Sequence, residues 1–149
     1  MTKDSLIGAP VARVGGEGRV TGEQRYVADI HLPNELHVKL VTVPAARARI
    51  RSVDKSAALA LPGVRLAMTA DDLPQPVPRF GPQFTDRPVI ATGETKYHGD
   101  PVAAVAAETR DAAEEAARLV QVDYEELPAA FTIEGALAPD APLVQDPSL

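Results

Sequence analysis

Residues 99–129 read GDPVAAVAAETRDAAEEAARLVQVDYEELPA, and successive patterns within them predict the central unit of the fold. An apolar run from Val102 to Ala107 has no polar face and is short enough for a buried strand. Thr109 can then cap a helix, because its side chain can accept a backbone N–H of the first turn. Small apolar residues follow at helical spacing, at Ala112, Ala113, Ala116, Ala117 and Val120. These two patterns predict a strand followed by a helix.

A third pattern closes the stretch. Val120, Val122 and Tyr124 alternate with polar residues until Pro128 ends the run, which is typical of a half-exposed strand. The whole stretch therefore predicts a strand–helix–strand unit.

One alternative is a single helix from Pro101 to Gln121. Asp100 could cap such a helix, and proline is well tolerated at its first position. The alternative fits less well, because residues 102–107 lack the polar face that the segment after Thr109 has.

Shorter elements are expected around this unit. The sequence up to Gly18 has little periodicity and predicts an extended arm, and Val20-Thr21-Gly22 suggests a further turn. Residues 36–42 predict a strand with Leu36, Val38, Leu40 and Thr42 on one face. The remaining expected elements are a short helix over 55–61, a strand over 64–69, a helical turn over 71–73, a proline-rich surface excursion over 74–88 and a short element over 131–138.

Composition sets bounds on the function. The 149 residues suit one domain with one core, and the net charge of −6 argues against general binding to nucleic acid or anionic membranes. The absence of cysteine excludes disulfides, thiolate chemistry and iron–sulfur ligation within this chain. No apolar stretch approaches the roughly twenty residues that span a bilayer, and residues 1–6 lack a signal-peptide core, so a cytoplasmic location is expected.

The segment from Tyr97 to Ala129 resembles the strand–helix–strand segment of a known domain, the α/β hammerhead domain. This is the amino-terminal domain in the large subunits of molybdenum hydroxylases, which form the xanthine dehydrogenase and aldehyde oxidase family. Further matches occur upstream in family order: Arg13, Val20-Thr21-Gly22, Tyr26, Asp29, Leu36-His37, Pro44, Ala48-Arg49-Ile50, Asp54, Pro62-Gly63-Val64, Thr69-Ala70 and Asp72-Leu73-Pro74. The order of these matches makes the resemblance specific.

The resemblance implies an α+β fold of the hammerhead type, with a mixed sheet, two main helices and a β excursion. We expect an N-terminal arm at 1–12, the hammerhead domain at 13–135 and a C-terminal exit segment at 136–149. It also implies a structural role in a molybdopterin-dependent oxidoreductase that hydroxylates an aldehyde or heterocycle. The partner would be the molybdenum-binding region of the large subunit, with iron–sulfur and flavin (FAD) subunits as further possible partners.

No catalytic, cofactor-binding or metal-binding residue is expected in this chain itself. In the resembled family, the molybdopterin contacts and the catalytic glutamate come from regions that follow this domain. The alternative function is a stand-alone interaction or small-ligand-binding module, because a fold does not determine a function.

Four features of the sequence could suggest sites, and each has a simpler interpretation. The glycines at 15, 16 and 18 are not expected to form a dinucleotide-binding loop, which needs a strand before them and a helix after them, because Val20-Thr21-Gly22 suggests a turn instead. Arg47, Arg49 and Arg51 could form an anion site, although a solvated face or an ionic contact with a neighbouring domain is favoured. Asp71-Asp72 suits helix initiation better than metal binding. The histidines, His31, His37 and His98, have no metal-binding spacing on one predicted helix.

An apolar docking patch is expected instead. Phe80 and Phe84 in the excursion could cover part of the core or meet a partner domain, and the sequence favours neither. Together with Leu143 and Val144 in the exit segment, they have no evident place in the strand–helix–strand core. We expect these side chains to form a surface that binds the molybdenum region, or that the isolated chain buries by self-association.

Overall fold

The computed structural model describes residues 10–145, so the ends of the expected arm and exit segment lie outside the described residues. The chain divides into two compact units, Met1–Glu35 and Leu36–Leu149.

Between residues 10 and 35, the first unit contains the short helix α1 (Gly16–Thr21) and the 3-10 helix η1 (Val27–Asp29). The expectation of an extended arm and a turn is therefore wrong for residues 16–21. Gly15 (φ 68°) and Gly22 (φ 80°) bracket α1 in left-handed conformations that glycine adopts without strain. Residues 10–15 form no strand, so the arrangement of a dinucleotide-binding loop is absent from the described part of this unit.

The second unit is built on a three-stranded antiparallel sheet in the order β1 (His37–Thr42), β7 (Pro101–Ala107), β3 (Val64–Met68). The strands expected over 36–42, 64–69 and 102–107 are thereby confirmed. Val38 pairs with Ala106 and Leu40 with Ala104, which puts these four side chains on one face of the sheet. Val41 and Val105 point to the other face and are buried.

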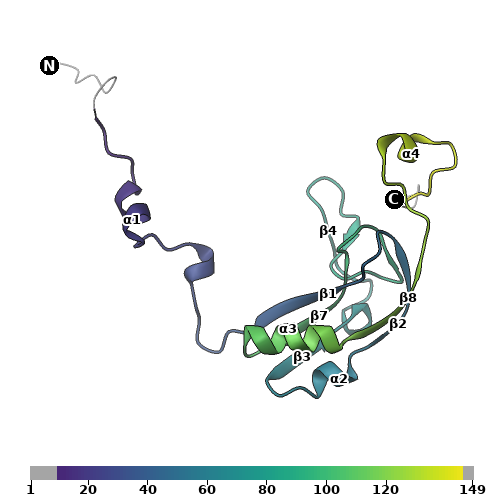
Figure 1. Ribbon diagram of the computed structural model, residues 1–149, viewed down its shortest axis with the longest axis horizontal. Helices are drawn as coiled ribbons and strands as arrows, with labels where there is room; N and C mark the ends of the chain where they lie inside the picture. The colour runs from purple at the N-terminus through teal and green to yellow at the C-terminus, as the bar shows by residue number, and fades with distance from the viewer. Residues whose placement is uncertain (1–9, 146–149) are drawn as a thin grey trace. The chain divides into compact units, whose positions relative to one another are not determined.

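Helix α3 (Arg110–Leu119) covers that second face and contacts all three strands (Figure 1). The backbone N–H of Ala112 donates to the hydroxyl of Thr109 at 3.1 Å, which is the predicted cap. Ala113 and Ala116 are buried and let the helix backbone approach the strands closely. The alternative single helix from Pro101 to Gln121 is wrong, because β7 occupies its first half. The predicted short helix is present as α2 (Ser56–Leu59), beside α3 and β3.

A second three-stranded sheet has the order β6 (Glu94–Thr95), β2 (Ala48–Asp54), β8 (Gln121–Glu126). The strand–helix–strand prediction is confirmed, but its two strands belong to different sheets. The pairings of both sheets are antiparallel, so the α+β class is confirmed while the expected mixed sheet is wrong. A parallel pair would have formed if β7 and β8 had paired with one another across α3. Instead, β7 pairs with β1 and β3, and β8 pairs with β2, and all of these pairings are antiparallel.

The excursion and the ends of the unit hold short elements. The strands β4 (Arg79–Phe80) and β5 (Arg87–Pro88) form a small antiparallel ladder, as the expected β excursion requires. The helical turn expected near 71–73 is the 3-10 helix η2 (Ala70–Asp72), and the final short element is α4 (Ile133–Leu137). No helix in residues 10–145 combines the length and apolar character needed to cross a membrane.

Candidate functional site

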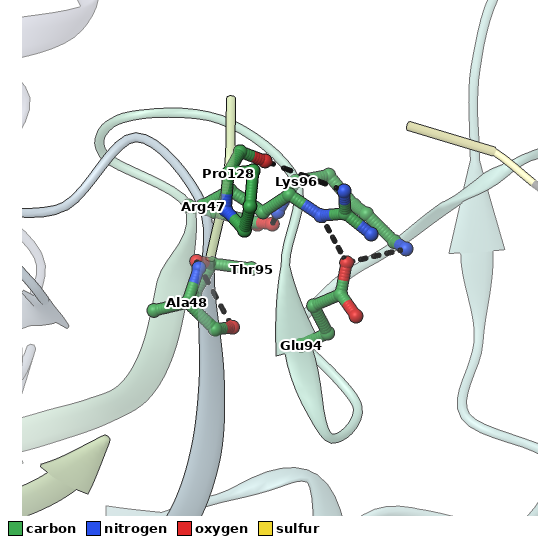
Figure 2. A network of polar contacts seen from close by, with 7 residues as sticks. Arg47, Ala48, Glu94, Thr95, Lys96 and Pro128 are labelled. Atoms are coloured by element: carbon green, nitrogen blue, oxygen red, sulfur yellow. Dashed lines mark hydrogen bonds and ion pairs between the residues drawn. The ribbon is translucent and has the colours of Figure 1, made fainter. Parts of the chain in front are cut away.

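Arg47, Glu94 and Lys96 form a partly buried polar cluster (Figure 2). Arg47 Nε donates to Glu94 Oε1 at 2.6 Å, and Lys96 Nζ donates to the same oxygen at 3.2 Å. Burial alone would raise the pKa of Glu94, but the hydrogen bonds from Arg47 and Lys96 outweigh it and hold that pKa below its ordinary value. The carboxylate is therefore an ionised structural partner and is unsuited to act as a general acid or base near neutral pH.

Arg47 also forms hydrogen bonds with the segment that follows β8. Its Nη1 donates to the carbonyl of Pro128 at 3.4 Å, and its own carbonyl accepts the backbone N–H of Leu127 at 3.0 Å. One residue thus joins the loop before β2, the strand β6 and the start of the C-terminal segment.

Two buried polar side chains next to the cluster have structural partners. Thr95 is fully buried, and its hydroxyl accepts the backbone N–H of Ala48 at 2.9 Å. Asp100 is 3% exposed and accepts the backbone N–H of Lys96 at 2.9 Å. Within residues 10–145, every buried side-chain nitrogen or oxygen has a hydrogen-bond partner. The cluster therefore lacks the unsatisfied group that would suggest a missing ligand.

Two cavities adjoin this cluster. One of about 370 Å³ is lined by residues that include Tyr97, Arg87 and Asp100. Burial and the negative charge of Asp100 raise the pKa of Tyr97, while the nearby charge of Arg87 lowers it slightly, so the phenol stays protonated at neutral pH. The guanidinium carbon of Arg87 lies 5.9 Å from the centre of the Tyr97 ring, within cation–π range.

The other cavity, of about 480 Å³, is lined by Arg47, Lys96 and His98 together with alanines, prolines, Leu143 and Val144 from the C-terminal segment. No acidic side chain is among the described residues that line it. The cavity could accommodate a small anion with an apolar body, but it holds no nucleophile paired with a base.

The predicted row of three arginines is divided in the structure. Arg47 pairs with Glu94, whereas Arg49 and Arg51 both contact Glu125 Oε2, at 3.4 and 3.1 Å. The register of β2 shifts between Ile50 and Ser52, so the side chains around Arg51 no longer alternate regularly between the two faces of the sheet. These ionic contacts lie within the domain and neutralise much of the charge that an anion site would need.

The paired aspartates, Asp71 and Asp72, lie in the first turn of the 3-10 helix η2, and Asp72 caps its start. Asp72 accepts the backbone N–H of Thr69 at 2.8 Å and contacts the ammonium group of Lys55. The hydrogen bond from Lys55, followed by that from Thr69, lowers the pKa of Asp72. Asp72 therefore acts as a capping residue for η2.

The histidines lie apart. His31 forms a 2.8 Å contact with Glu35, His37 is on β1, and His98 is in the turn after β6. In the part of the chain that the structure describes, no three His, Cys, Asp or Glu side chains are grouped so that they could hold a metal ion.

The expected docking side chains are exposed. Phe80 and Phe84, and Leu143 and Val144, all have large accessible fractions. The excursion and the exit segment also meet, because Gln145 donates to Asp86 at 3.2 Å and Val144 lines the same cavity as Asp86.

A second exposed apolar surface was not anticipated. On the sheet face opposite α3, Val38 is 64% exposed, Leu40 52% and Leu66 44%. Ala104 lies on the central strand between them, and Met68 lies beside Leu66 on β3. The alternation of residues 36–42 indicated that Val38 and Leu40 share a face, but the pattern alone cannot tell which face packs against a helix. We call these five residues the outer sheet face.

The comparisons with known proteins all indicate the same family. The family model described as "Aldehyde oxidase and xanthine dehydrogenase, a/b hammerhead domain" matches residues 21–128. A protein of Bacillus subtilis (strain 168), described as a probable xanthine dehydrogenase component, is 40% identical over 129 residues, which are 87% of this chain and 17% of that protein. The carbon monoxide dehydrogenase large chain of Hydrogenophaga pseudoflava is 36% identical over 129 residues, 85% of this chain and 16% of that protein.

A solved structure agrees with these relatives. Quinoline 2-oxidoreductase from Pseudomonas putida 86 superposes with a TM-score of 0.81 and 42% sequence identity, over 88% of this chain and 18% of that one. The chain thus spans less than a fifth of the length of each of these three proteins.

Proposed function

The chain belongs to the aldehyde oxidase and xanthine dehydrogenase family, as its a/b hammerhead domain, and on this premise we propose that it is a structural domain of a molybdopterin-dependent oxidoreductase. The complete enzyme would hydroxylate an aldehyde or heterocycle. This domain would pack against the molybdenum-binding region of the large subunit, with iron–sulfur and flavin subunits as further neighbours in a cytoplasmic enzyme.

The outer sheet face is the observation that carries this proposal. Val38, Leu40 and Leu66 are large apolar side chains on neighbouring strands, and each is about half exposed or more. Soluble monomers rarely expose contiguous apolar patches larger than a few hundred Å² unless they bind something. In a protein whose relatives are more than five times as long, the remainder of the large subunit is a fitting partner.

The residues of this chain do not fit a cofactor site of their own. The sequence contains no cysteine for an iron–sulfur cluster, and residues 10–145 contain no grouped metal ligands. Molybdopterin, iron–sulfur clusters and FAD would therefore be held by other parts of the complete enzyme. The residues of the polar cluster around Arg47 are proposed to be structural.

The domain boundaries are part of the same proposal. A hammerhead domain over 13–135 encloses the family match at 21–128, with an arm before it and an exit segment after it.

The proposal is tested by expressing residues 1–149 as a separate tagged polypeptide in the native source, together with the molybdenum-binding region as another polypeptide. Recovery together with a molybdenum-containing polypeptide would support it. Replacing Val38 and Leu66 with lysine should abolish that recovery, because each charge would be desolvated in the interface. The matched control is Leu59→Lys, since Leu59 is 47% exposed but lies on α2, which packs on the helix side of the sheet. Recovery of the chain alone, without molybdenum, would contradict the proposal.

The cavity lined by Arg47, Lys96 and His98 favours a second candidate, a small-ligand-binding module. In that case the isolated chain should bind an aromatic carboxylate such as benzoate, and Lys96→Gln should weaken the binding. The same chain should then be recovered without a molybdenum-containing partner.

A further inference from the structure

Residues 128–145, which we call the closing segment, are attached to the rest of the domain at their two ends. At the first end, Arg47 Nη1 donates to the carbonyl of Pro128 at 3.4 Å (Figure 2). At the other end, Gln145 Nε2 donates to Asp86 Oδ2 at 3.2 Å. The closing segment therefore begins beside the loop before β2 and ends beside the excursion.

Between these ends, the closing segment takes its shape from its own hydrogen bonds. Gly135 N donates to Thr132 Oγ1 at 3.0 Å, which caps α4, and Ala141 N donates to the carbonyl of Ala138 at 3.0 Å. No residue from 128 to 145 is buried. A region with few buried contacts and exposed hydrogen bonds is among the least stable parts of a fold and opens before the rest. We therefore expect the closing segment to open while the two sheets stay folded.

The closing segment forms one wall of the cavity of about 480 Å³. Eight of the thirteen described lining residues lie between 128 and 144, and all eight are alanine, proline, leucine or valine. The opposite wall includes Arg47 and Lys96. That wall is held in place by its neighbours Ala48 and Thr95, which are both fully buried. Opening of the closing segment would remove most of the lining, so the cavity exists only in the closed form.

The two walls differ in chemistry, and the difference indicates which ligand the closed cavity suits. Arg47 and Lys96 both donate to Glu94 Oε1, so two cations contact a single carboxylate. No acidic side chain is among the described lining residues, and His98 adds an imidazole ring to the polar wall. The wall formed by the closing segment is apolar. A ligand that fits both walls carries one negative group and an apolar body.

We propose that the closing segment is a lid over a binding site for a small carboxylate with an apolar body, and that the bound carboxylate holds the lid closed. The carboxylate contacts Arg47 and Lys96, and the apolar body packs against Leu143 and Val144. Because the site exists only in the closed form, binding shifts the equilibrium toward that form. The inference extends the second candidate function by making binding depend on a movement of the chain. It goes beyond the proposed structural role, so its failure would leave that role untouched.

Amide hydrogen exchange of the whole chain tests the lid, with benzoate as the probe. The Ala136 and Ala141 amides donate hydrogen bonds within the closing segment and report its opening. Benzoate at about ten times its Kd should slow their exchange about tenfold by mass action, and its ring should show nuclear Overhauser contacts to the Val144 methyl groups. Benzamide lacks the charge and acetate lacks the ring, so neither should have these effects. Equal slowing by benzamide, contacts at Val144 without slowing, or no benzoate binding would each overturn the inference.

A variant at the second attachment provides the other arm of the test. Gln145→Ala removes the hydrogen bond to Asp86, so it should speed exchange of the Ala141 amide and weaken benzoate affinity between about twofold and tenfold, the range that one net hydrogen bond gives. The denaturation midpoint should stay the same. Gln83→Ala, at an exposed residue of the same excursion, is the matched control and should change none of these quantities. Unchanged benzoate affinity in Gln145→Ala, or a lowered midpoint, would overturn the inference, whereas recovery with the molybdenum-binding region tests the proposed function alone.

Discussion

Arg47 and Glu94 are joined by a 2.6 Å hydrogen bond between side chains that are only 19% and 22% exposed, and this contact connects the loop before β2 to β6. We predict that Arg47→Ala destabilises the fold by about 1–3 kcal/mol, because it leaves a partly buried carboxylate with fewer partners. Arg49→Ala is the matched control. Its guanidinium contacts Glu125 in a solvent-exposed pair, so its loss should cost less than about 1 kcal/mol. Equal urea midpoints for the two variants would contradict the structural role of Arg47.

Glu94 also gives a prediction for pH. Its pKa is lowered from 4.5, so the unfolded chain binds its proton more readily, and the resulting stability is present above about pH 4.5 and is lost as the pH falls through the lower folded value. Asp54 and Asp72 are shifted in the same direction. Because three carboxylates contribute, Glu94→Gln should remove only part of the decrease in unfolding free energy between roughly pH 5 and pH 3. Parallel pH profiles for the variant and the unaltered chain, from thermal denaturation, would show that Glu94 makes no such contribution.

The packing of α3 gives a third prediction. Ala116 is completely buried and Ala113 is 2% exposed, so Ala116→Leu and Ala113→Leu should each overpack the helix–sheet contact and cost about 1–3 kcal/mol. The neighbouring Glu115 is exposed, with a 3.2 Å contact to Arg118, and Glu115→Ala should change stability by less than about 0.5 kcal/mol. Similar denaturation midpoints for the three variants would mean that the buried face of α3 is wrongly assigned.

Much of the fold was predictable from sequence because the signals are local. Thr109 and the alanines that follow it specify α3 through capping and periodicity, and Thr69 with Asp72 specifies η2 in the same way. Helix α1 was not predictable, because glycines at positions 16 and 18 have low helix propensity and no side chain caps its start.

Sheet membership was not predictable either, because it depends on partners far apart in the chain. Ala48 pairs with Glu126 and with Thr95, and Val38 pairs with Ala106. No pattern near β7 or β8 indicates that they belong to different sheets. For the same reason the cluster of Arg47, Glu94 and Lys96 carried no sequence signal, since Glu94 lies 47 residues from Arg47.

The docking residues were predictable in part. Phe80, Phe84, Leu143 and Val144 were expected at the surface because they fit no periodic element, and all four are exposed. The outer sheet face was not anticipated, because Leu66 on β3 joins Val38 and Leu40 only through the central strand β7.

The most direct test of the docking role is hydroxyl-radical footprinting of the chain alone and in its native assembly. If the outer sheet face binds the molybdenum region, oxidation of Leu40 and Leu66 should fall sharply in the assembly, while oxidation of Leu59 on α2 should stay the same. Equal oxidation of Leu40 and Leu66 in both samples would contradict the account, because the outer sheet face would then remain uncovered in the complete enzyme.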